Sequence, residues 1–233
     1  MAITDSDIAG VLTAYLERYP QEAGQLAEPL RLLAEGRGFA SRRTFPMHVT
    51  AGALLVRDGA EILLIEHLAY GITLQPGGHL EPTDTTLVGA ALRELSEETG
   101  IDPGQVALVS AHPAYVEFGR VPARPAKGER DHYHLDIGYA FATGDAEVGR
   151  IQESEVTGAA WYPLDLAERL VGPRIARAVT TSTGIRYPCT TGSSRGGQLT
   201  GREHPVVEGT GAGAIGVTTP PGARRRSRAS SSP

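Results

Sequence analysis

Apolar residues recur at helical spacing over the first forty residues, and at strand-like spacing over much of the next hundred. The first helical stripe predicts a helix over residues 7–19, with Ser6 as its N-cap. The residues of this stripe are Ile8, Val11, Leu12, Tyr15 and Leu16. Pro20 suits the first position of a second helix, because its missing N–H is one that a helix start leaves unbonded. Residues 1–40 are therefore expected to form a helical N-terminal extension.

Short apolar runs bounded by turn residues predict strands further along. The expected strands cover residues 49–56, 61–67, 73–75, 106–110, 114–118, 133–142 and 159–162. Helical spacing appears over residues 85–99, where Gly100 would end the helix. Two short helices, over residues 164–170 and 174–179, complete the pattern. This order predicts a mixed α/β (α+β) domain over residues 41–180.

The composition changes at about residue 180. Gly, Ser, Thr and Pro supply 30 of the 53 residues from 181 to 233, and apolar periodicity stops. This segment holds 7 Arg and 2 acidic residues, so residues 1–180 carry 15 basic and 25 acidic residues. Residues 181–233 are expected to form a disordered tail. Its basic run at 224–228 is read as a solvated segment or as an arm for an anionic partner. The composition of the whole segment would also fit the product of a shifted reading frame.

Charge and composition exclude several classes of protein. A net charge of −5 argues against a protein built around nucleic-acid backbone binding, so no specific nucleic-acid partner is expected. The single cysteine, Cys189, excludes an intramolecular disulfide framework and a multi-cysteine zinc site. The first residues do not show the basic region and apolar run of a secretory signal. The sequence also lacks the apolar stretch of about 18 residues that a membrane span needs. The expectation is a cytoplasmic protein without a membrane segment.

The helix predicted over residues 85–99 carries most of the candidate chemistry. Glu94, Glu97 and Glu98 lie at i, i+3 and i+4, so they project from one face. Arg93 can pair with Glu97, but one cation does not neutralise three carboxylates. Hard oxygen ligands of this kind suit Mg²⁺ or Mn²⁺, which bind through carboxylates and substrate phosphates. The Gly77-Gly78 pair before the helix lets backbone approach the same place. The alternative is a solvated acidic face beside a glycine turn.

The segment resembles the signature of the Nudix hydrolases, Gly-x5-Glu-x7-Arg-Glu-U-x-Glu-Glu-x-Gly-U, where U is a bulky aliphatic residue. Its second half is complete in Arg93, Glu94, Leu95, Glu97, Glu98, Gly100 and Ile101. The first half departs from the signature. Gly78 precedes Arg93 by 15 positions rather than 14, so the first glutamate's place falls on Asp84 or Thr85. Either side chain could cap the helix.

The resemblance implies a Nudix-like α/β/α sandwich with a mixed sheet. It also implies that Glu94, Glu97 and Glu98 hold Mg²⁺, or Mn²⁺, with the Gly78 carbonyl, while Arg93 orients the carboxylates. A carboxylate would activate water to cleave a diphosphate bond in a nucleoside diphosphate derivative or a nucleoside triphosphate. Glu98 is the first candidate for this base, with Glu97 beside it. Glu153 and Glu155 are candidates outside the helix.

Further residues are candidates for binding the small-molecule diphosphate substrate. They are His79, Arg120, His132, His134 and Glu155. His132, His134 and Asp136 alternate along the chain, so they share one strand face. If this face is functional, a substrate pocket is favoured over a transition-metal triad. The alternative is a polar strand face with ordinary hydrogen bonds.

Arg120 also belongs to a basic loop with Arg124, Lys127 and Arg130, which is either a phosphate contact or simply solvated. Tyr115, Phe118 and Trp161 are expected in the core rather than stacked on a base. The N-terminal helices could form a homodimer interface. Other functions open to the chain are isomerisation, cleavage of a non-nucleotide diphosphate, and nucleotide sensing without catalysis.

Overall fold

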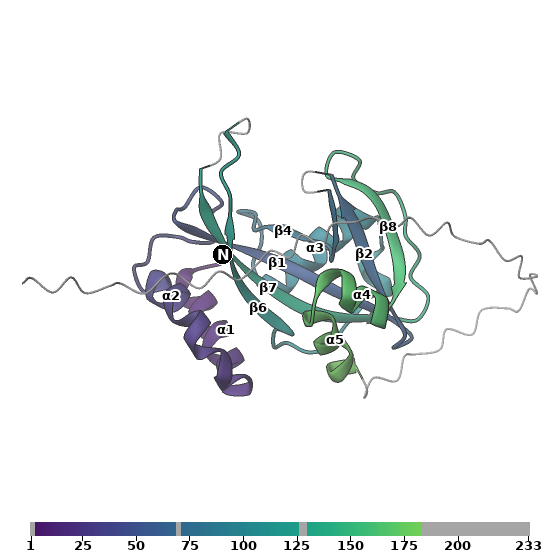
Figure 1. Ribbon diagram of the computed structural model, residues 1–233, viewed down its shortest axis with the longest axis horizontal. Helices are drawn as coiled ribbons and strands as arrows, with labels where there is room; N and C mark the ends of the chain where they lie inside the picture. The colour runs from purple at the N-terminus through teal and green to yellow at the C-terminus, as the bar shows by residue number, and fades with distance from the viewer. Residues whose placement is uncertain (1–2, 69–70, 126–129, 183–233) are drawn as a thin grey trace, which may run out of the picture. The chain divides into compact units, whose positions relative to one another are not determined.

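The computed structural model describes residues 3–68, 71–125 and 130–182, drawn in colour in Figure 1. The tail expected over residues 181–233 lies outside these ranges, apart from its first two residues, which continue the last helix. Lys127 and Cys189 also lie outside the described residues. The described elements belong to one compact unit.

Five helices and eight strands make up the described part of the chain. The helices are α1 (Asp5–Arg18), α2 (Ala23–Leu33), α3 (Leu87–Thr99), α4 (Leu164–Val171) and α5 (Arg174–Ser182), with 3₁₀ turns at Pro20–Glu22 and Pro103–Gln105. The strands are β1 (Met47–Arg57), β2 (Glu61–His67), β3 (Ile72–Leu74), β4 (Gly77–His79), β5 (Ala107–Leu108), β6 (Tyr115–Val121), β7 (His132–Thr143) and β8 (Val156–Pro163).

The strands form one mixed sheet with the order β3-β2-β1-β7-β5. Three further strands join this path, with β4 on β1, β6 on β7 and β8 on β2. The long central strands β1 and β7 run parallel, with Met47 opposite Tyr133 and Arg57 opposite Thr143. The remaining pairs are antiparallel. β1 and β7 therefore form the centre of the sheet, beside which the shorter strands pair.

Alternate residues of β1 face two different cores. Val49, Ala51 and Ala53 belong to a cluster that includes Ala91 and Leu95 of α3. The residues between them point to the other face, where Leu54 and Val56 pack with α4 and α5 through residues such as Ala167 and Ile175. The sheet thus lies between α3 on one face and α4 and α5 on the other (Figure 1). This confirms the predicted α/β/α sandwich.

The N-terminal helices pack onto the domain. Ile8, Leu12 and Leu26 are fully buried and join the cluster that contains α3. The Tyr15 hydroxyl donates to Glu22 at 2.7 Å, and Arg177 of α5 bonds to both residues. The apolar stripe of α1 is therefore buried against this chain's own domain. A homodimer formed through these helices stays a prediction.

Several predicted boundaries were wrong at the ends of elements. α1 begins at Asp5 because Thr4, and not Ser6, accepts the capping bond, from the backbone N–H of Asp7. The Asp7 carboxylate bonds back to the Thr4 N–H, and this completes a capping box. Pro20 starts a 3₁₀ turn, and α2 follows it. β4 falls where only a glycine turn was expected. Among the described residues, none of the helices is long and apolar enough to cross a membrane.

Candidate active site

Both ends of α3 are fixed by local bonds. Thr86 is extended, and its hydroxyl accepts the backbone N–H of Gly89 at 2.9 Å. The prediction that Asp84 or Thr85 caps this helix was therefore wrong, because Thr86 fills the position. At the other end Gly100 adopts a left-handed conformation with φ of 68°, which ends the helix as predicted.

We expect Thr86→Ala to lower the free energy of unfolding by about 1 kcal/mol, because the first turn of α3 loses its side-chain cap. Urea denaturation monitored by circular dichroism measures the change. Thr85→Ala is the matched control, since Thr85 is the exposed neighbour and does not cap the helix. Equal losses in the two variants would contradict the assignment of the cap.

The three glutamates of α3 differ in exposure. Glu98 is 1% exposed and Glu94 is 7% exposed, whereas Glu97 is exposed. Glu98 accepts the backbone N–H of Gly77 at 2.8 Å through one carboxylate oxygen. Its other oxygen, Oε1, is buried and has no hydrogen-bond partner within the described residues. A buried carboxylate oxygen without a partner needs a cation or a water molecule to be satisfied.

The backbone of β4 passes directly over Glu94. A Cβ added to Gly78 would lie 2.7 Å from the Glu94 carboxyl carbon and both of its oxygens. Only glycine allows this approach, because any side chain would displace the carboxylate. The pairing of β4 with β1, with Gly78 opposite Ala51, holds the strand in this place. The predicted meeting of the Gly77-Gly78 backbone with the glutamate face of the helix is therefore present.

Arg93 ties the loop before α3 to the glutamates. Its guanidinium donates two hydrogen bonds to Asp84, at 3.0 and 3.1 Å, and one to the carbonyl of His79 at 3.0 Å. It also donates to Glu94 at 3.0 Å and to Glu97 at 2.8 Å, and the last of these pairs was predicted. Asp84 is not a cap. It is the buried partner that holds Arg93 over the carboxylates.

Burial shifts the pKa values of the inner carboxylates upward. Burial raises the pKa of Glu94 to about 7 despite the neighbouring Arg93. Burial also raises the pKa of Glu98 to about 8. The negative charge of Glu94 adds to this rise, whereas the hydrogen bond from Gly77 opposes it. For Asp84 the burial is outweighed by its hydrogen bonds from Arg93 and Glu81, so its pKa is lowered. The site therefore holds excess negative potential that Arg93 does not cancel.

The donor set fits a hard divalent cation. Glu94 and Glu98 supply buried carboxylate oxygens, one of them without a partner, and the glycine backbone lies against them. Arg93 draws Glu94 and Glu97 to itself, so the three carboxylates do not converge on one point as they stand.

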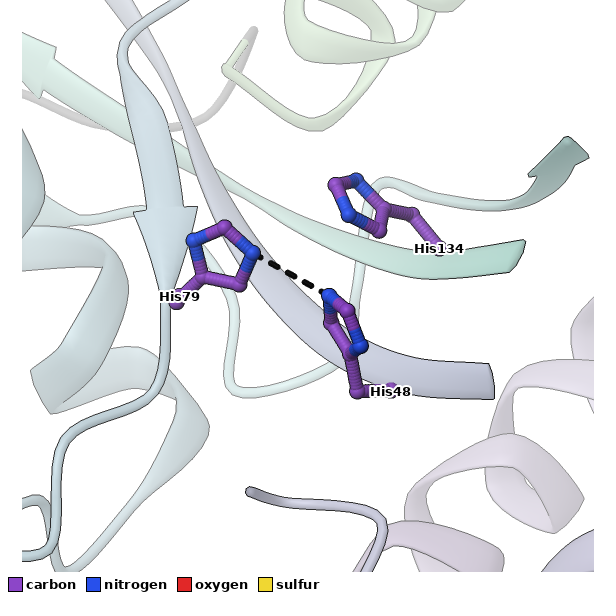
Figure 2. A group of neighbouring side chains, drawn as sticks. All are labelled: His48, His79 and His134. Atoms are coloured by element: carbon purple, nitrogen blue, oxygen red, sulfur yellow. Dashed lines mark hydrogen bonds between the residues drawn. The ribbon is translucent and has the colours of Figure 1, made fainter. Parts of the chain in front are cut away.

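A second polar cluster lies on the opposite face of β1, and we call it the histidine pocket. Its lining residues are Arg42, Phe45, His48, His79, Arg124, His132 and His134. The cavity measures about 40 Å³. Figure 2 shows the rings of His48, His79 and His134 turned toward one another from β1, β4 and β7. The sequence indicated His79, His132 and His134. It gave no sign of His48, which the register of β1 against β7 places opposite His134.

The rings of the histidine pocket contact one another closely. His48 Nε2 and His79 Nε2 lie 3.1 Å apart, and so do His132 Nε2 and His134 Nε2. Burial is the main cause that lowers the pKa of His79 to about 3 and of His134 to about 2, and the neighbouring His48 adds to both shifts. These two rings are therefore neutral at physiological pH.

The other candidate residues lie around these two clusters. Glu155 is exposed, but its charge helps to raise the pKa of both Glu94 and Glu98, so it belongs to the same acidic surface. Arg120 is exposed and pairs with Asp131 between β6 and β7. A role for Arg120 in binding substrate stays a prediction, as it does for Glu155.

Asp136 and the aromatic residues of the strands were also weighed as functional groups, and their contacts lie within the fold. Asp136 accepts bonds from Tyr115 at 2.8 Å and from Thr50 at 2.9 Å, so its carboxylate is satisfied within the sheet. Tyr115 is 1% exposed, and Phe118 stacks on Tyr133 with ring centroids 4.8 Å apart. The prediction of a core position is confirmed for Tyr115, whereas Phe118 and Trp161 are only partly buried at the border of the cluster that contains α3.

Comparison with known proteins finds a family whose model matches this chain. The NUDIX domain model matches residues 46–181, which is more than half of the chain. Curated relatives named "Phosphatase NudJ", from Escherichia coli K12 and Shigella flexneri, are 43% identical over 70 residues. That match covers 29% of this chain and 44% of each relative, so the chain spans less than half the length of these proteins.

The solved structures that match this chain are more distant in sequence. An Ap4A hydrolase of C. elegans, in a binary complex, is 19% identical with a TM-score of 0.45, over 59% of this chain and 98% of the other. A MutT NUDIX hydrolase of Burkholderia pseudomallei is 24% identical with a TM-score of 0.40 over the same shares. The family model over residues 46–181 agrees with the sandwich, the capped helix and its buried glutamates, and on that evidence this chain belongs to the NUDIX family.

Proposed function

We propose that this protein hydrolyses a diphosphate bond in a small molecule, in the presence of Mg²⁺ or Mn²⁺. The observation that carries the proposal is the buried pair Glu94 and Glu98, held against the backbone of Gly77 and Gly78. Burying two carboxylates side by side is costly, so a fold keeps such a pair where charge has to be bound or moved. The curated relatives that match over 70 residues are named phosphatases, which supports the same reaction class.

Glu94, Glu98 and the Gly78 carbonyl are the groups that would hold the cation, and Glu97 lies at the outer edge of the same face. When bound, the ion supplies positive charge that offsets the diphosphate and makes water more acidic. Arg93 keeps the carboxylates oriented, because its five hydrogen bonds span the loop and the helix. Its charge also contributes to holding an anionic substrate.

Glu98 is the residue that accepts the proton of the attacking water. Its Oε1 is buried without a partner in the described part of the chain, and Gly77 fixes the other oxygen. Glu155, from the loop before β8, is the second candidate because its charge acts on the same carboxylates.

The substrate class we propose is a nucleoside diphosphate derivative or a nucleoside triphosphate. The histidine pocket lies on the other face of β4 and β1 from the glutamates, so a role for its residues in binding substrate stays a prediction. His79 and Arg124 are both among its lining residues. Neutral imidazoles and guanidinium groups suit phosphate or ribose oxygens.

The stability of the metal-free protein is expected to fall between pH 6.5 and 8. Glu94 and Glu98 keep their protons longer in the folded state, with pKa values of about 7 and 8, than in the unfolded state. The folded protein therefore binds more protons in this window, and raising the pH favours unfolding. Folding lowers the pKa values of His79 and His134, so these groups change the stability only below about pH 6.5. In that range their effect is opposite, because raising the pH favours the folded state.

Urea denaturation in EDTA at pH 6.5 and pH 8 measures this loss, which at about 1.4 kcal/mol per pKa unit reaches about 2–3 kcal/mol at most. Addition of Mg²⁺ at pH 8 is expected to restore stability, since the cation takes the place of the protons. A metal-free protein that gains stability over this window would contradict the account of the buried carboxylates.

The direct test is a substrate panel. The full chain is assayed with Mg²⁺ or Mn²⁺ on nucleoside triphosphates, ADP-ribose, NADH, dinucleoside polyphosphates and prenyl diphosphates, and the released phosphate, pyrophosphate and monophosphates are measured. We expect turnover of at least one nucleotide, and none in EDTA. Turnover of prenyl diphosphates alone would show that the substrate is a diphosphate without a nucleoside. Rearrangement without bond cleavage would indicate an isomerase.

Binding without turnover would indicate a sensing module. In that case nucleotide would raise the melting temperature, while no product would form at any metal concentration. Such a result from folded protein would overturn the proposed activity, even though all the carboxylates of the site are present.

A further inference from the structure

Three strands bring imidazole rings to one point in the histidine pocket. His48 of β1, His79 of β4 and His134 of β7 each offer a ring nitrogen, and these nitrogens all lie within 4.8 Å of one another (Figure 2). Across the described ranges, this is the single group of three or more potential ligand residues that is close enough to hold a metal ion as it stands. The glutamates of α3 do not form such a group.

The spacing of the nitrogens suits a tetrahedral ion. Zinc bound to histidine has a Zn–N distance of about 2.0–2.1 Å, which places two ligand nitrogens about 3.3 Å apart in a tetrahedral site. His48 Nε2 and His79 Nε2 are 3.1 Å apart, so a small outward movement of the rings makes room for the ion. His132 Nε2 lies 3.1 Å from His134 Nε2 and adds a fourth nitrogen nearby.

A backbone carbonyl fixes the tautomer of His132 in the histidine pocket. The His132 Nδ1 lies 2.7 Å from the carbonyl of Arg130, which only accepts, so Nδ1 carries the proton and Nε2 keeps its lone pair. A carbonyl on the outer nitrogen is the usual support for a histidine ligand. In the contact of 3.1 Å between His132 Nε2 and His134 Nε2, the His134 nitrogen is then the donor, so coordination through it requires that proton to move to Nδ1.

Ligand chemistry separates this cluster from the carboxylates of α3. Imidazole nitrogens suit zinc, nickel and copper, whereas carboxylate and carbonyl oxygens suit magnesium and manganese. Gly78 and His79 are neighbours on β4, and adjacent strand residues point to opposite faces. Gly78 lies against Glu94, and the His79 ring lies against His48 on the other side of the sheet.

Two arginines decide what else the ion would need. Arg42 and Arg124 line the same pocket as the three histidines and bring positive charge to it. They oppose a bare cation and favour one that carries an anionic ligand. Three protein ligands leave an open position for such a ligand, as in catalytic rather than structural zinc sites.

We propose that His48, His79 and His134 form a binding site for a divalent transition-metal ion of the zinc class, with an open coordination position toward Arg42 and Arg124. His132 stands beside the site as a further ligand or as the support of His134. The site is independent of the proposed hydrolysis, and its test does not use activity.

The experiment is a metal titration of the full chain without a polyhistidine tag. The protein is stripped with chelator, saturated with Mg²⁺ to occupy the carboxylates, and titrated with Co²⁺ and then Zn²⁺. We expect one equivalent of Co²⁺ to bind with the visible absorption of a tetrahedral nitrogen site, and Zn²⁺ to displace it. Competition with a coloured chelator gives the Zn²⁺ affinity.

Variants locate the site. His134→Ala is expected to weaken Zn²⁺ binding at least about 100-fold, because loss of a supporting residue alone commonly costs 10–100-fold. His48→Gln provides the same test if His134→Ala does not fold. His112→Ala is the matched control, since His112 is exposed and outside the pocket, and it should bind as the parent does. Glu98→Gln should also leave Zn²⁺ binding unchanged.

Two results would overturn this proposal. One is Zn²⁺ binding of equal strength in the parent, His134→Ala and His48→Gln. The other is the absence of Co²⁺ absorption together with binding of inorganic phosphate that His134→Ala abolishes, which would make the pocket an anion site. Because the readouts are absorption and affinity, failure here leaves the proposed hydrolysis standing, and inactivity in the substrate panel leaves this site standing.

Discussion

Replacing Glu98 with glutamine is expected to abolish hydrolysis while making the metal-free protein more stable. We expect the turnover rate to fall by at least about 1,000-fold, because the variant loses both a cation ligand and the base that accepts the proton of water. Glutamine keeps the oxygen that accepts the Gly77 N–H. It carries no buried charge, so at pH 8 the metal-free variant should melt at a higher temperature than the parent.

Opposite changes in activity and stability distinguish this role from a structural one. A residue that only supports the fold would lower both quantities when it is replaced. Glu168→Gln, at an exposed position of α4, is the matched control and should alter neither. Turnover of Glu98→Gln within tenfold of the parent would contradict the assignment of Glu98, and so would a lower melting temperature in EDTA.

The second large effect is expected from Arg93→Met, which should lower the free energy of unfolding by about 3–5 kcal/mol. The substitution leaves Asp84 buried and ionised without its two hydrogen bonds from the guanidinium. Removal of one partner from a buried ion pair commonly has a cost of this size. Urea denaturation at pH 7 measures it, and activity should fall as the carboxylates lose their orientation.

A double substitution and a control separate the sources of this loss. Arg93→Met combined with Asp84→Asn should recover part of the stability, because no buried charge is then left alone. Arg169→Met is the matched control, since Arg169 pairs with Asp165 at i,i+4 on the exposed side of α4. Surface pairs of this kind contribute about 0–1 kcal/mol. Equal losses at positions 93 and 169 would contradict the structural role of Arg93.

The helix of the site was predictable because its information is local. Apolar spacing located α3, Gly100 marked its end, and the i, i+3, i+4 spacing placed three glutamates on one face. The cap was harder to predict, because Asp84, Thr85 and Thr86 are adjacent and all suited to the position. The choice depends on the loop, in which Asp84 is already engaged by Arg93.

Only part of the histidine pocket could be predicted from the sequence. Alternation placed His132 and His134 on one face of β7, and this is a local property. Their meeting with His48 depends on the parallel register of β1 and β7, strands that lie more than eighty residues apart in the chain. Their meeting with His79 depends on β4, a strand of three residues that read as a glycine turn. Neither long-range pairing leaves a pattern in a single sequence.

The most direct measurement of the central claim is hydrolysis of the best nucleotide of the panel in ¹⁸O-labelled water, with mass spectrometry of both products. Attack of water on a diphosphate bond predicts one ¹⁸O atom in one of the two phosphorylated products for each turnover, only with Mg²⁺ or Mn²⁺ and not in Glu98→Gln. Products without label would show that water does not open the bond. Labelled products formed equally in EDTA would show that the buried carboxylates do not act through a cation.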